Sequence, residues 1–217
     1  MSRREEAKEF NRARIRAAAE DIIRRDGIAQ LSMRRLAEQA DVSLRTPYNL
    51  FGSKADVLIA LLDEAECQLS PLADMYPASS AIARLLGTLA GIETFFAHDE
   101  EYFRGIYAAI MTSDHHGARE AGVGRTITTA QQMVARAAAQ GELRADTDTA
   151  ALGRYCGIAL LAVLGMWGSG FLSISQCIAQ TRRTWLAALL HHASEQTRAG
   201  LLDAYYETCG KGDANDR

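Results

Sequence analysis

The sequence predicts an all-α protein with a three-helix head at the N-terminus and a larger helical body behind it. The chain has 217 residues, of which 48% are hydrophobic and only 3 are proline. Apolar residues recur every three or four positions over long segments, and no run of alternating β-branched residues is typical of a strand. A chain of this length and composition buries a core of its own. We expect the head to span residues 1–54 and the body residues 55–217.

Positive charge is concentrated at the front of the chain. The whole sequence carries a formal charge of −3, but residues 1–54 hold 12 Lys and Arg against 8 Asp and Glu, a net charge of +4. The remaining residues hold 12 and 19, a net charge of −7. Local charge decides what a surface attracts, because charges are screened beyond about 8 Å at physiological ionic strength. The pattern fits a polyanion-binding head on an acidic body, and it fits a solvated, charged N-terminal helix equally well.

Two predicted helices open the head. Between residues 11 and 25 apolar side chains recur at helical spacing, and Asp26-Gly27 supplies a turn that ends the helix. Ser32 is a suitable N-cap for a second helix, which runs to about Gln39.

A third predicted helix is short, polar and sharply bounded. Ser43 is its expected N-cap and Gly52 ends it, so Pro47 is its fourth residue, where a proline removes at most the first backbone hydrogen bond. Ser53, with Asp56 three residues later, has the capping-box pattern that opens the next helix. Two helices of about eight residues joined by a short turn, with a third packed behind them, are the layout of a helix-turn-helix.

The short third helix is the one that such a motif inserts into the major groove of DNA. Its outward residues are polar: Arg45, Thr46, Tyr48 and Asn49. Arginine pairs with guanine and asparagine with adenine through two hydrogen bonds each, and hydroxyl groups reach phosphates or bases. Val42 and Phe51 are expected to face the small core instead.

The N-terminal region resembles the DNA-binding head of tetracycline-repressor-like (TetR family) transcriptional regulators. The residues that carry the resemblance are Ile15, Ala18, Ala19, Gly27, Ser32, Leu36, Ala37, Ala40, Val42, Ser43, Thr46, Tyr48, Phe51, Ser53, Lys54 and Leu58. They lie within about the first 60 residues and follow the family's spacing without a gap. Pro47 departs from the pattern, since many members carry a larger apolar residue there.

The resemblance implies roles for eight residues of the head. Ser32, Arg34, Tyr48 and Lys54 would hold backbone phosphates, whereas Leu44, Arg45, Thr46 and Asn49 would face bases. It also implies a homodimer on a palindromic operator, because two such motifs related by a twofold axis read half-sites about 34 to 36 Å apart. A small-molecule effector in the body would shift the helix that begins near Ser53 and so change the spacing of the two heads.

The body is expected to consist of longer helices. Their predicted ranges are about 56–69, 82–96, 100–111, 118–140, 148–168 and 175–192, with a short helical segment at about 195–206. Pro71 and Pro77 are expected to bracket a loop, and residues 210–217 are expected to be disordered.

Residues 155–181 contain no charged side chain, which raises a membrane span as one interpretation. The unbroken apolar run covers only residues 158–167, a length more typical of a buried helix. The resemblance implies that the last two long helices pack against their counterparts in a dimer. Small residues there would permit close approach, although an ordinary intramolecular core explains the same pattern: Gly153, Gly157, Ala159 and Ala162.

Aromatic residues crowd between positions 95 and 107, and further aromatic and methionine residues follow. We predict that these side chains line an apolar effector pocket: Phe95, Phe96, Tyr102, Phe103, Tyr107, Met111, Met133, Trp167 and Phe171. Tyr and Trp carry hydrogen-bond donors that an all-apolar core does not need, and the resemblance implies an effector cavity in this half of the chain. For each residue taken singly, plain core packing is the alternative.

Metal, redox and catalytic sites are not favoured. His98 and the histidine pairs at 115–116 and 191–192 lack metal-ligand spacing, and Cys67 is more typical of a small buried hydrophobe than of a redox trigger. No catalytic or nucleotide-binding motif is found. We therefore expect no metal, no cofactor and no enzymatic activity. The four cysteines lack C-x-x-C spacing and the N-terminus is charged, which favours a cytoplasmic location.

The sequence as a whole predicts a homodimeric, ligand-responsive transcriptional regulator, with a repressor favoured over an activator. Two alternatives stay open. One is an architectural DNA-binding protein without an effector. The other is a helical small-molecule-binding protein or enzyme whose first 54 residues only look like a DNA-binding head.

Overall fold

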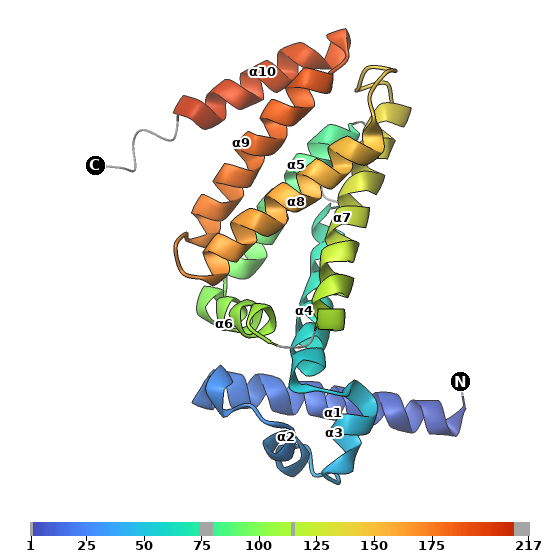
Figure 1. Cartoon of the computed structure of the whole chain (residues 1–217), viewed down its shortest axis with the longest axis vertical. Helices are drawn as coiled ribbons and strands as arrows, with labels where there is room; N and C mark the ends of the chain where they lie inside the picture. The colour runs from blue at the N-terminus through green and yellow to red at the C-terminus, as the bar shows by residue number, and fades with distance from the viewer. Residues whose placement is uncertain (1, 74–79, 114–115, 211–217) are drawn as a thin grey trace. The chain divides into compact units, whose positions relative to one another are not determined.

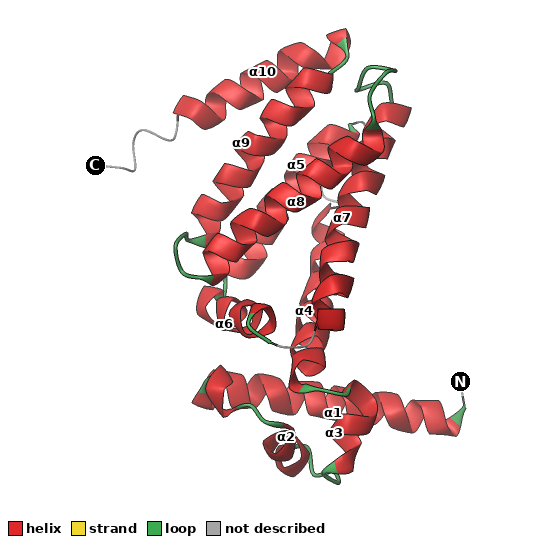
Figure 2. Ribbon diagram, viewed as in Figure 1, coloured by secondary structure: helices red, strands yellow, loops and turns green. Residues whose placement is uncertain are grey.

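A computed structural model of the chain describes residues 2–73, 80–113 and 116–210. Within these ranges the regular elements are all helical, so the predicted all-α class is confirmed (Figure 2). The elements are α1 (Arg3–Asp26), the 3-10 turn η1 (Ile28–Gln30), α2 (Met33–Gln39), α3 (Arg45–Phe51), α4 (Lys54–Ala73), α5 (Ala81–Ala97), α6 (Glu100–Met111), α7 (His116–Ala139), α8 (Thr149–Gly168), α9 (Ile174–His192) and α10 (Glu195–Gly210).

The chain divides into two compact units, and each of them consists of two segments that are separated in sequence. The N-terminal unit comprises Met1–Gln68 and Glu101–Arg119. The C-terminal unit comprises Leu69–Glu100 and Glu120–Arg217. The N-terminal unit therefore contains, besides α1 to α3, most of α4 and nearly all of α6.

The core of the N-terminal unit is built on the apolar face of α1. Ile15 and Ile22 of this helix are fully buried, and Leu36 of α2 packs into the same cluster. Ile106 and Ile110 of α6 also belong to the cluster. Thus α6, although remote in sequence, is part of the core that supports the helix-turn-helix.

Helix α1 begins eight residues earlier than the sequence predicts. It starts at Arg3 because Ser2 and Glu5 form a capping box, in which the Ser2 hydroxyl accepts a hydrogen bond from the Glu5 amide at 3.4 Å. The Glu5 carboxylate in turn accepts from the Ser2 amide at 2.9 Å. Residues 2–10 are all exposed, so this part of α1 lacks the apolar periodicity that marks the rest of the helix.

The start of α3 differs from the prediction by one residue. Leu44 rather than Ser43 is the N-cap, and it makes no side-chain capping bond. Ser43 instead accepts a hydrogen bond from the Thr46 amide through its carbonyl oxygen at 2.8 Å. Pro47 is consequently the third residue of α3, where the backbone N–H has no partner within a helix, and the proline ring is free to pack inward.

In the C-terminal unit, α8 and α9 form an antiparallel hairpin, with α5 and α10 packed against α9 (Figure 1). The Trp185 indole of α9 donates to the Cys156 carbonyl oxygen of α8 at 2.9 Å. In the same unit the Ala81 amide donates to the Gln140 side chain and the Ile82 amide to the Glu142 carboxylate. These two hydrogen bonds fix the start of α5.

Two of the small residues of α8, Gly153 and Gly157, serve contacts within the chain. A Cβ atom added at Gly153 would lie 2.4 Å from the Cα of Gln131 in α7, and one added at Gly157 would lie 2.9 Å from the Cα of Ile127. The close approach that these two glycines allow is therefore between α8 and α7 of the same chain.

The expectation that Pro71 begins a loop is wrong, and the expectation of disorder near the C-terminus stays a prediction. Helix α4 continues through Pro71 to Ala73, so the helix ends later than predicted. A proline in the last turn of a helix removes a single backbone hydrogen bond, which an otherwise well-supported helix tolerates. Pro77 and residues 211–217 lie outside the described residues.

Of the described helices, α8 alone is long and apolar enough to cross a membrane by length and composition. Only 28% of its most apolar window is buried. A single such helix is weak evidence for a membrane span, because helices of soluble proteins pass the same test.

Candidate nucleic-acid interface

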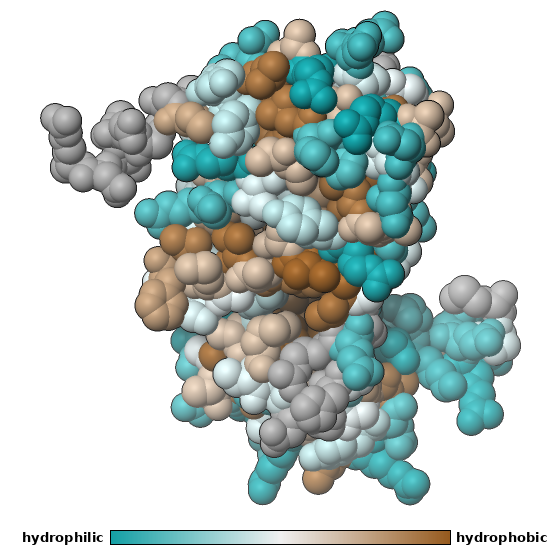
Figure 3. Space-filling view, turned by 45° about the horizontal axis from the view of Figure 1, so that its top comes forward, coloured by the Kyte–Doolittle hydropathy of each residue, from teal (hydrophilic) through white to brown (hydrophobic). Residues whose placement is uncertain are grey.

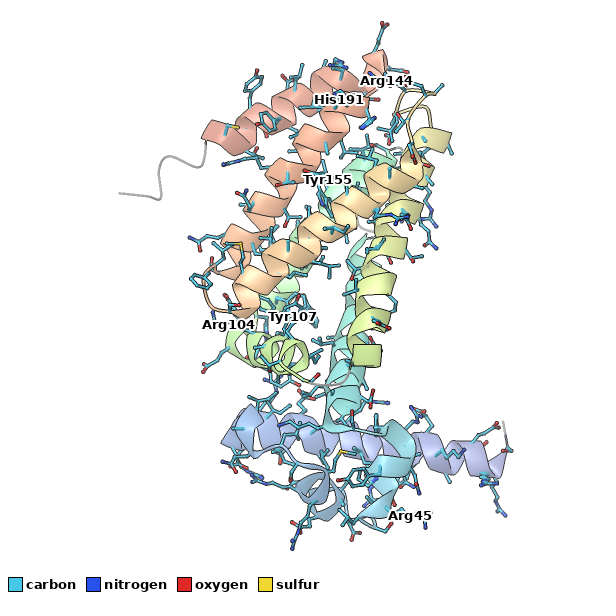
Figure 4. The ribbon with its side chains drawn as sticks, in the orientation of Figure 1. Arg45, Arg104, Tyr107, Arg144, Tyr155 and His191 are labelled. Atoms are coloured by element: carbon cyan, nitrogen blue, oxygen red, sulfur yellow. The ribbon has the colours of Figure 1, made fainter. Side chains whose placement is uncertain are left out.

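Helix α3 and its N-cap Leu44 expose most of the side chains that the sequence assigns to bases, together with Tyr48, which it assigns to phosphate. Leu44 is 54% exposed and Tyr48 is 52% exposed, while Arg45 and Asn49 also lie at the surface. Pro47, on the opposite side of the helix, is buried. Figure 4 shows Arg45 at the outer edge of the N-terminal unit. The helix therefore presents Arg45, Tyr48 and Asn49 to solvent, with Leu44 exposed beside them.

The first turn of α3 is braced by its own hydroxyl groups. The hydroxyl oxygens of Ser43 and Thr46 lie 2.8 Å apart and share a hydrogen bond. Thr46 is half-buried, and its side chain is oriented before any partner binds. A hydroxyl group that is held in this way still offers hydrogen-bonding capacity to a phosphate or a base.

The start of α2 is suited to phosphate binding. Ser32 caps this helix, as predicted, by accepting a hydrogen bond from the Arg35 amide at 3.2 Å, which leaves its O–H free to donate. The Arg34 side chain is 82% exposed and pairs with Glu38 at 3.0 Å. Because an exposed ion pair of this kind is weak, Arg34 remains available to a phosphate.

Lys54 has a structural partner that the sequence did not reveal. Its ammonium group donates to the Ile28 carbonyl oxygen of η1 at 3.1 Å, and burial lowers its pKa. This bond ties the first residue of α4 to the turn after α1. An ammonium group has three donors, so two remain for a phosphate.

Two arginines of α1 connect this helix to the helix-turn-helix. The Arg12 guanidinium lies over the ring of Phe51, 5.4 Å from its centre. Arg14 donates to the Asp41 carbonyl oxygen at 3.4 Å and lies 3.5 Å from the Asp41 carboxylate. These contacts fix α1 relative to α3 and to the turn that precedes it, and a sequence pattern gives no sign of them.

Asp41 in this turn has a left-handed backbone conformation, with φ of 48°. Glycine adopts this conformation freely, whereas a Cβ atom makes it unfavourable. We expect Asp41→Gly to be at least as stable as the unmodified protein and Asp41→Ala to be less stable than Asp41→Gly by about 1 kcal/mol. Urea unfolding of the two variants checks this, and an alanine variant that equals the glycine variant contradicts it. The ion pair with Arg14 is lost in both, so it does not affect the comparison.

The residues predicted to bind an effector fall into two sets. Tyr102, Phe103, Tyr107 and Met111 belong to the N-terminal unit. Tyr102 lies under the Arg24 guanidinium, 4.2 Å from ring centre to Cζ, and both Tyr102 and Met111 pack on the head core. Phe103 is 8% exposed. These residues support α6 on α1.

The other predicted effector residues belong to the C-terminal unit. The Phe96 ring packs edge-on against Phe95 and Trp167, with centroids 5.6 Å and 5.5 Å away. Trp167 is fully buried, Met133 is half-buried, and Phe171 is 80% exposed. The structure therefore brings three of the nine residues into one described aromatic cluster and leaves Phe171 at the surface.

Glu100 anchors this aromatic cluster, although no sequence pattern selects it. Its carboxylate accepts hydrogen bonds from the Trp167 indole N–H at 3.0 Å and from the Ile174 amide at 3.1 Å. One oxygen atom thus joins the start of α6 to the end of α8 and the start of α9. A half-buried acidic residue with fixed donors is the kind of polar anchor that small-molecule sites use.

Two of the described cysteine residues, Cys156 and Cys177, are buried in the C-terminal unit. Burial raises the pKa of Cys156 to about 12 and that of Cys177 to about 11, so both stay as thiols at neutral pH. The side chains of Cys67, His115 and His116 lie outside the described part of the structure. Among those described, no group of three or more His, Cys, Asp or Glu residues is arranged to hold a metal ion.

The comparisons agree with this geometry. Residues 15–61 match the family of bacterial regulatory proteins known as the tetR family. A search of curated proteins finds no match. Among solved structures, the chain is similar to Thermus thermophilus FadR, a TetR-family repressor in complex with lauroyl-CoA, with a TM-score of 0.65, 18% identity, and coverage of 85% of this chain and 97% of that one.

A second similar structure is TylP, a TetR regulator from Streptomyces fradiae. The TM-score is 0.63 at 15% identity, and the likeness covers 94% of this chain and 97% of that one. At such identities the likeness is one of fold. It extends over both units, whereas the sequence match is confined to the helix-turn-helix region.

Proposed function

We propose that this chain, a TetR-family transcriptional regulator by its helix-turn-helix segment and its fold, is a homodimeric repressor that leaves a palindromic operator when a small molecule binds. The observation that carries the proposal is the exposed polar face of α3, which follows α2 at helix-turn-helix spacing. Arg45 and Asn49 are assigned to bases through bidentate hydrogen bonds. Ser32, Arg34, Tyr48 and Lys54 are assigned to phosphates, which set the register of the protein on DNA.

Dimerisation is supported by an exposed apolar stripe on α8. Tyr155, Ile158 and Met166 are 52%, 52% and 49% exposed, and their spacing places them along one side of the helix. Figure 3 shows hydrophobic side chains interrupting the polar surface on the face that it presents. Burying such a stripe against a second copy removes apolar area from water and would place two recognition helices in twofold register.

The effector is proposed to be a small, partly apolar molecule bound in the C-terminal unit. Support comes from the aromatic cluster around Trp167 with its Glu100 anchor, and from the lauroyl-CoA held by the structurally similar Thermus protein. Release would pass through α6, which starts at Glu100 in the C-terminal unit and then supplies Ile106 and Ile110 to the head core. The start of α4 at Lys54 offers a second route. A coupling of about 1 to 3 kcal/mol changes DNA affinity roughly 5- to 150-fold.

The experiment that tests the proposal is DNA binding by the full chain. We expect the purified protein to select a palindromic fragment from its own genome, and Arg45→Ala with Tyr48→Ala to weaken that binding about 100-fold in a gel shift at fixed salt. Arg136→Ala, at an exposed position of α7, serves as the control and should bind as the unmodified protein does. If the double variant bound DNA as tightly as the unmodified protein, α3 would not be the helix that recognises DNA.

A further inference from the structure

The first three turns of α1 form an element that the proposed function does not use. Residues 3–14, called here the N-terminal extension, precede the segment that matches the family, which begins at residue 15. No residue before Ile15 is buried in the described chain. A helix of 12 residues is about 18 Å long. The extension is therefore a helical segment of some length whose side chains cover no buried core.

Charge is sorted around the extension. Residues four and three apart share a face of a helix, so Arg4, Lys8 and Asn11 continue the face that Ile15 opens onto the core. Glu5 and Glu9 share the neighbouring face, on which Glu5 also lies three residues from Lys8. The extension therefore has a basic face in line with the core face of α1 and an acidic face beside it.

Two of the acidic residues are engaged within the protein, whereas Arg4 and Lys8 form no ion pair, although the helix-cap hydrogen bonds and then the charge of Lys8 lower the pKa of Glu5. Glu5 caps the helix start, and Glu9 pairs with Arg16 at 3.2 Å. None of the ion pairs among the described residues uses Arg4 or Lys8. Both side chains are exposed. The extension thus exposes two cations without an ion-pair partner, and part of its negative charge is used in the helix cap and the Glu9–Arg16 pair.

The extension has a fixed orientation relative to the recognition helix. Arg12 lies over the Phe51 ring at the end of α3, and Arg14 contacts Asp41 in the turn before it. Within the N-terminal unit, Figure 1 shows the first turns of α1 continuing past α3. Helix α1 is continuous from Arg3 to Asp26, so these contacts hold the extension beside α3. A partner that binds α3 therefore lies next to the extension.

We propose that the N-terminal extension is a second DNA-contact element, which lies along the sugar-phosphate backbone beside the groove that α3 enters and binds phosphates through Arg4 and Lys8. The proposal rests on the proposed function, because it requires that α3 reads DNA. Duplex DNA is the partner that matches a basic face next to a recognition helix, since its phosphates are spaced about every 1.7 Å along the axis when both strands are counted.

Salt dependence of DNA binding by the full chain tests the proposal. Each phosphate contact contributes about −0.9 to the slope of log K against log salt concentration. Arg4→Gln with Lys8→Gln should therefore make the slope per protomer shallower by about 1.8 and weaken operator and unrelated DNA by similar factors of about 10-fold or more. Arg4→Lys with Lys8→Arg should keep the original slope, because the charges are retained.

Two controls separate the possible outcomes. Arg136→Gln with Arg198→Gln makes the same change in net charge at exposed positions of the C-terminal unit and should leave the slope unchanged. Far-UV circular dichroism verifies that the helix content of the extension variant is retained. If the unmodified protein binds its operator and the extension variant has the same slope, the extension makes no phosphate contact and the proposal is wrong. If the unmodified protein binds no DNA, it is the proposed function that fails instead.

Discussion

Replacing Gly153 by alanine is expected to destabilise the C-terminal unit by about 3 kcal/mol. The added Cβ would lie 2.4 Å from the Cα and 2.8 Å from the backbone nitrogen of Gln131, distances that require α7 and α8 to move apart. Gln131 also donates to the Ala150 carbonyl oxygen at 3.1 Å, and that bond would stretch with the helices. Overpacking of a close helix contact costs about 1 to 3 kcal/mol and sometimes more, and here the obstacle is backbone that no rotamer change removes.

A glycine in the neighbouring helix supplies the matched control. A Cβ at Gly124 of α7 meets nothing within 4 Å. Gly124→Ala should therefore stabilise the protein by up to about 1 kcal/mol, because alanine is the better helix former. Equilibrium urea unfolding followed by circular dichroism compares the two variants. If Gly153→Ala were also neutral or stabilising, α7 and α8 would not pack as closely as the structure has them.

Gly153 also illustrates what the sequence left undecided. Small residues at positions 153 and 157 signal a close helix partner, but a pattern on one helix does not say which helix that partner is. Contact with a second copy and contact with α7 predict the same residues. Only the fold assigns the glycines to α7, which leaves the exposed stripe with Tyr155 and Ile158 for a partner subunit in the proposed dimer.

The helix ends of the head were more predictable because their signals are local. Ser32 as an N-cap, Gly27 and Gly52 as stops, and the pairing of Ser53 with Asp56 each depend on residues three or four positions apart. The predicted start of α3 is one residue early because the Ser43 hydroxyl pairs with the Thr46 hydroxyl and does not cap a backbone amide of the helix. Local rules thus locate the helix but do not choose between adjacent polar residues.

The hydrogen bonds between residues far apart in the chain could not be predicted from the sequence. Lys54 bonds to a carbonyl oxygen 26 positions away, and Glu100 accepts from groups 67 and 74 positions away. The aromatic run between residues 95 and 107 was interpreted as one pocket wall. The aromatic run is instead divided between two helices that pack in different units. Tyr102 of α6 packs on Arg24 of α1, whereas Phe96 of α5 packs on Trp167 of α8.

Replacing Trp167 by alanine is expected to be the most destabilising single change, at about 4 kcal/mol. The side chain is fully buried, and truncation of a buried tryptophan removes a large apolar contact and leaves a cavity, which costs about 3 to 5 kcal/mol. The change also removes one of the two donors to the Glu100 carboxylate. Trp167→Phe keeps ring packing against Phe96 and loses the indole N–H, so it should cost about 1 to 2 kcal/mol.

A double-mutant cycle shows whether Glu100 and Trp167 act as one unit. Glu100→Ala leaves the indole N–H and the Ile174 amide without their acceptor, and should cost about 2 to 3 kcal/mol, whereas Glu100→Gln keeps an acceptor oxygen and should cost about 1 kcal/mol or less. In urea unfolding, Glu100→Ala combined with Trp167→Phe should lose at least about 0.5 kcal/mol less than the sum of the single variants, because the shared hydrogen bond is removed only once. Strict additivity would mean that the hydrogen bond contributes nothing. Trp185 remains in every variant of the cycle as a buried fluorescent reporter.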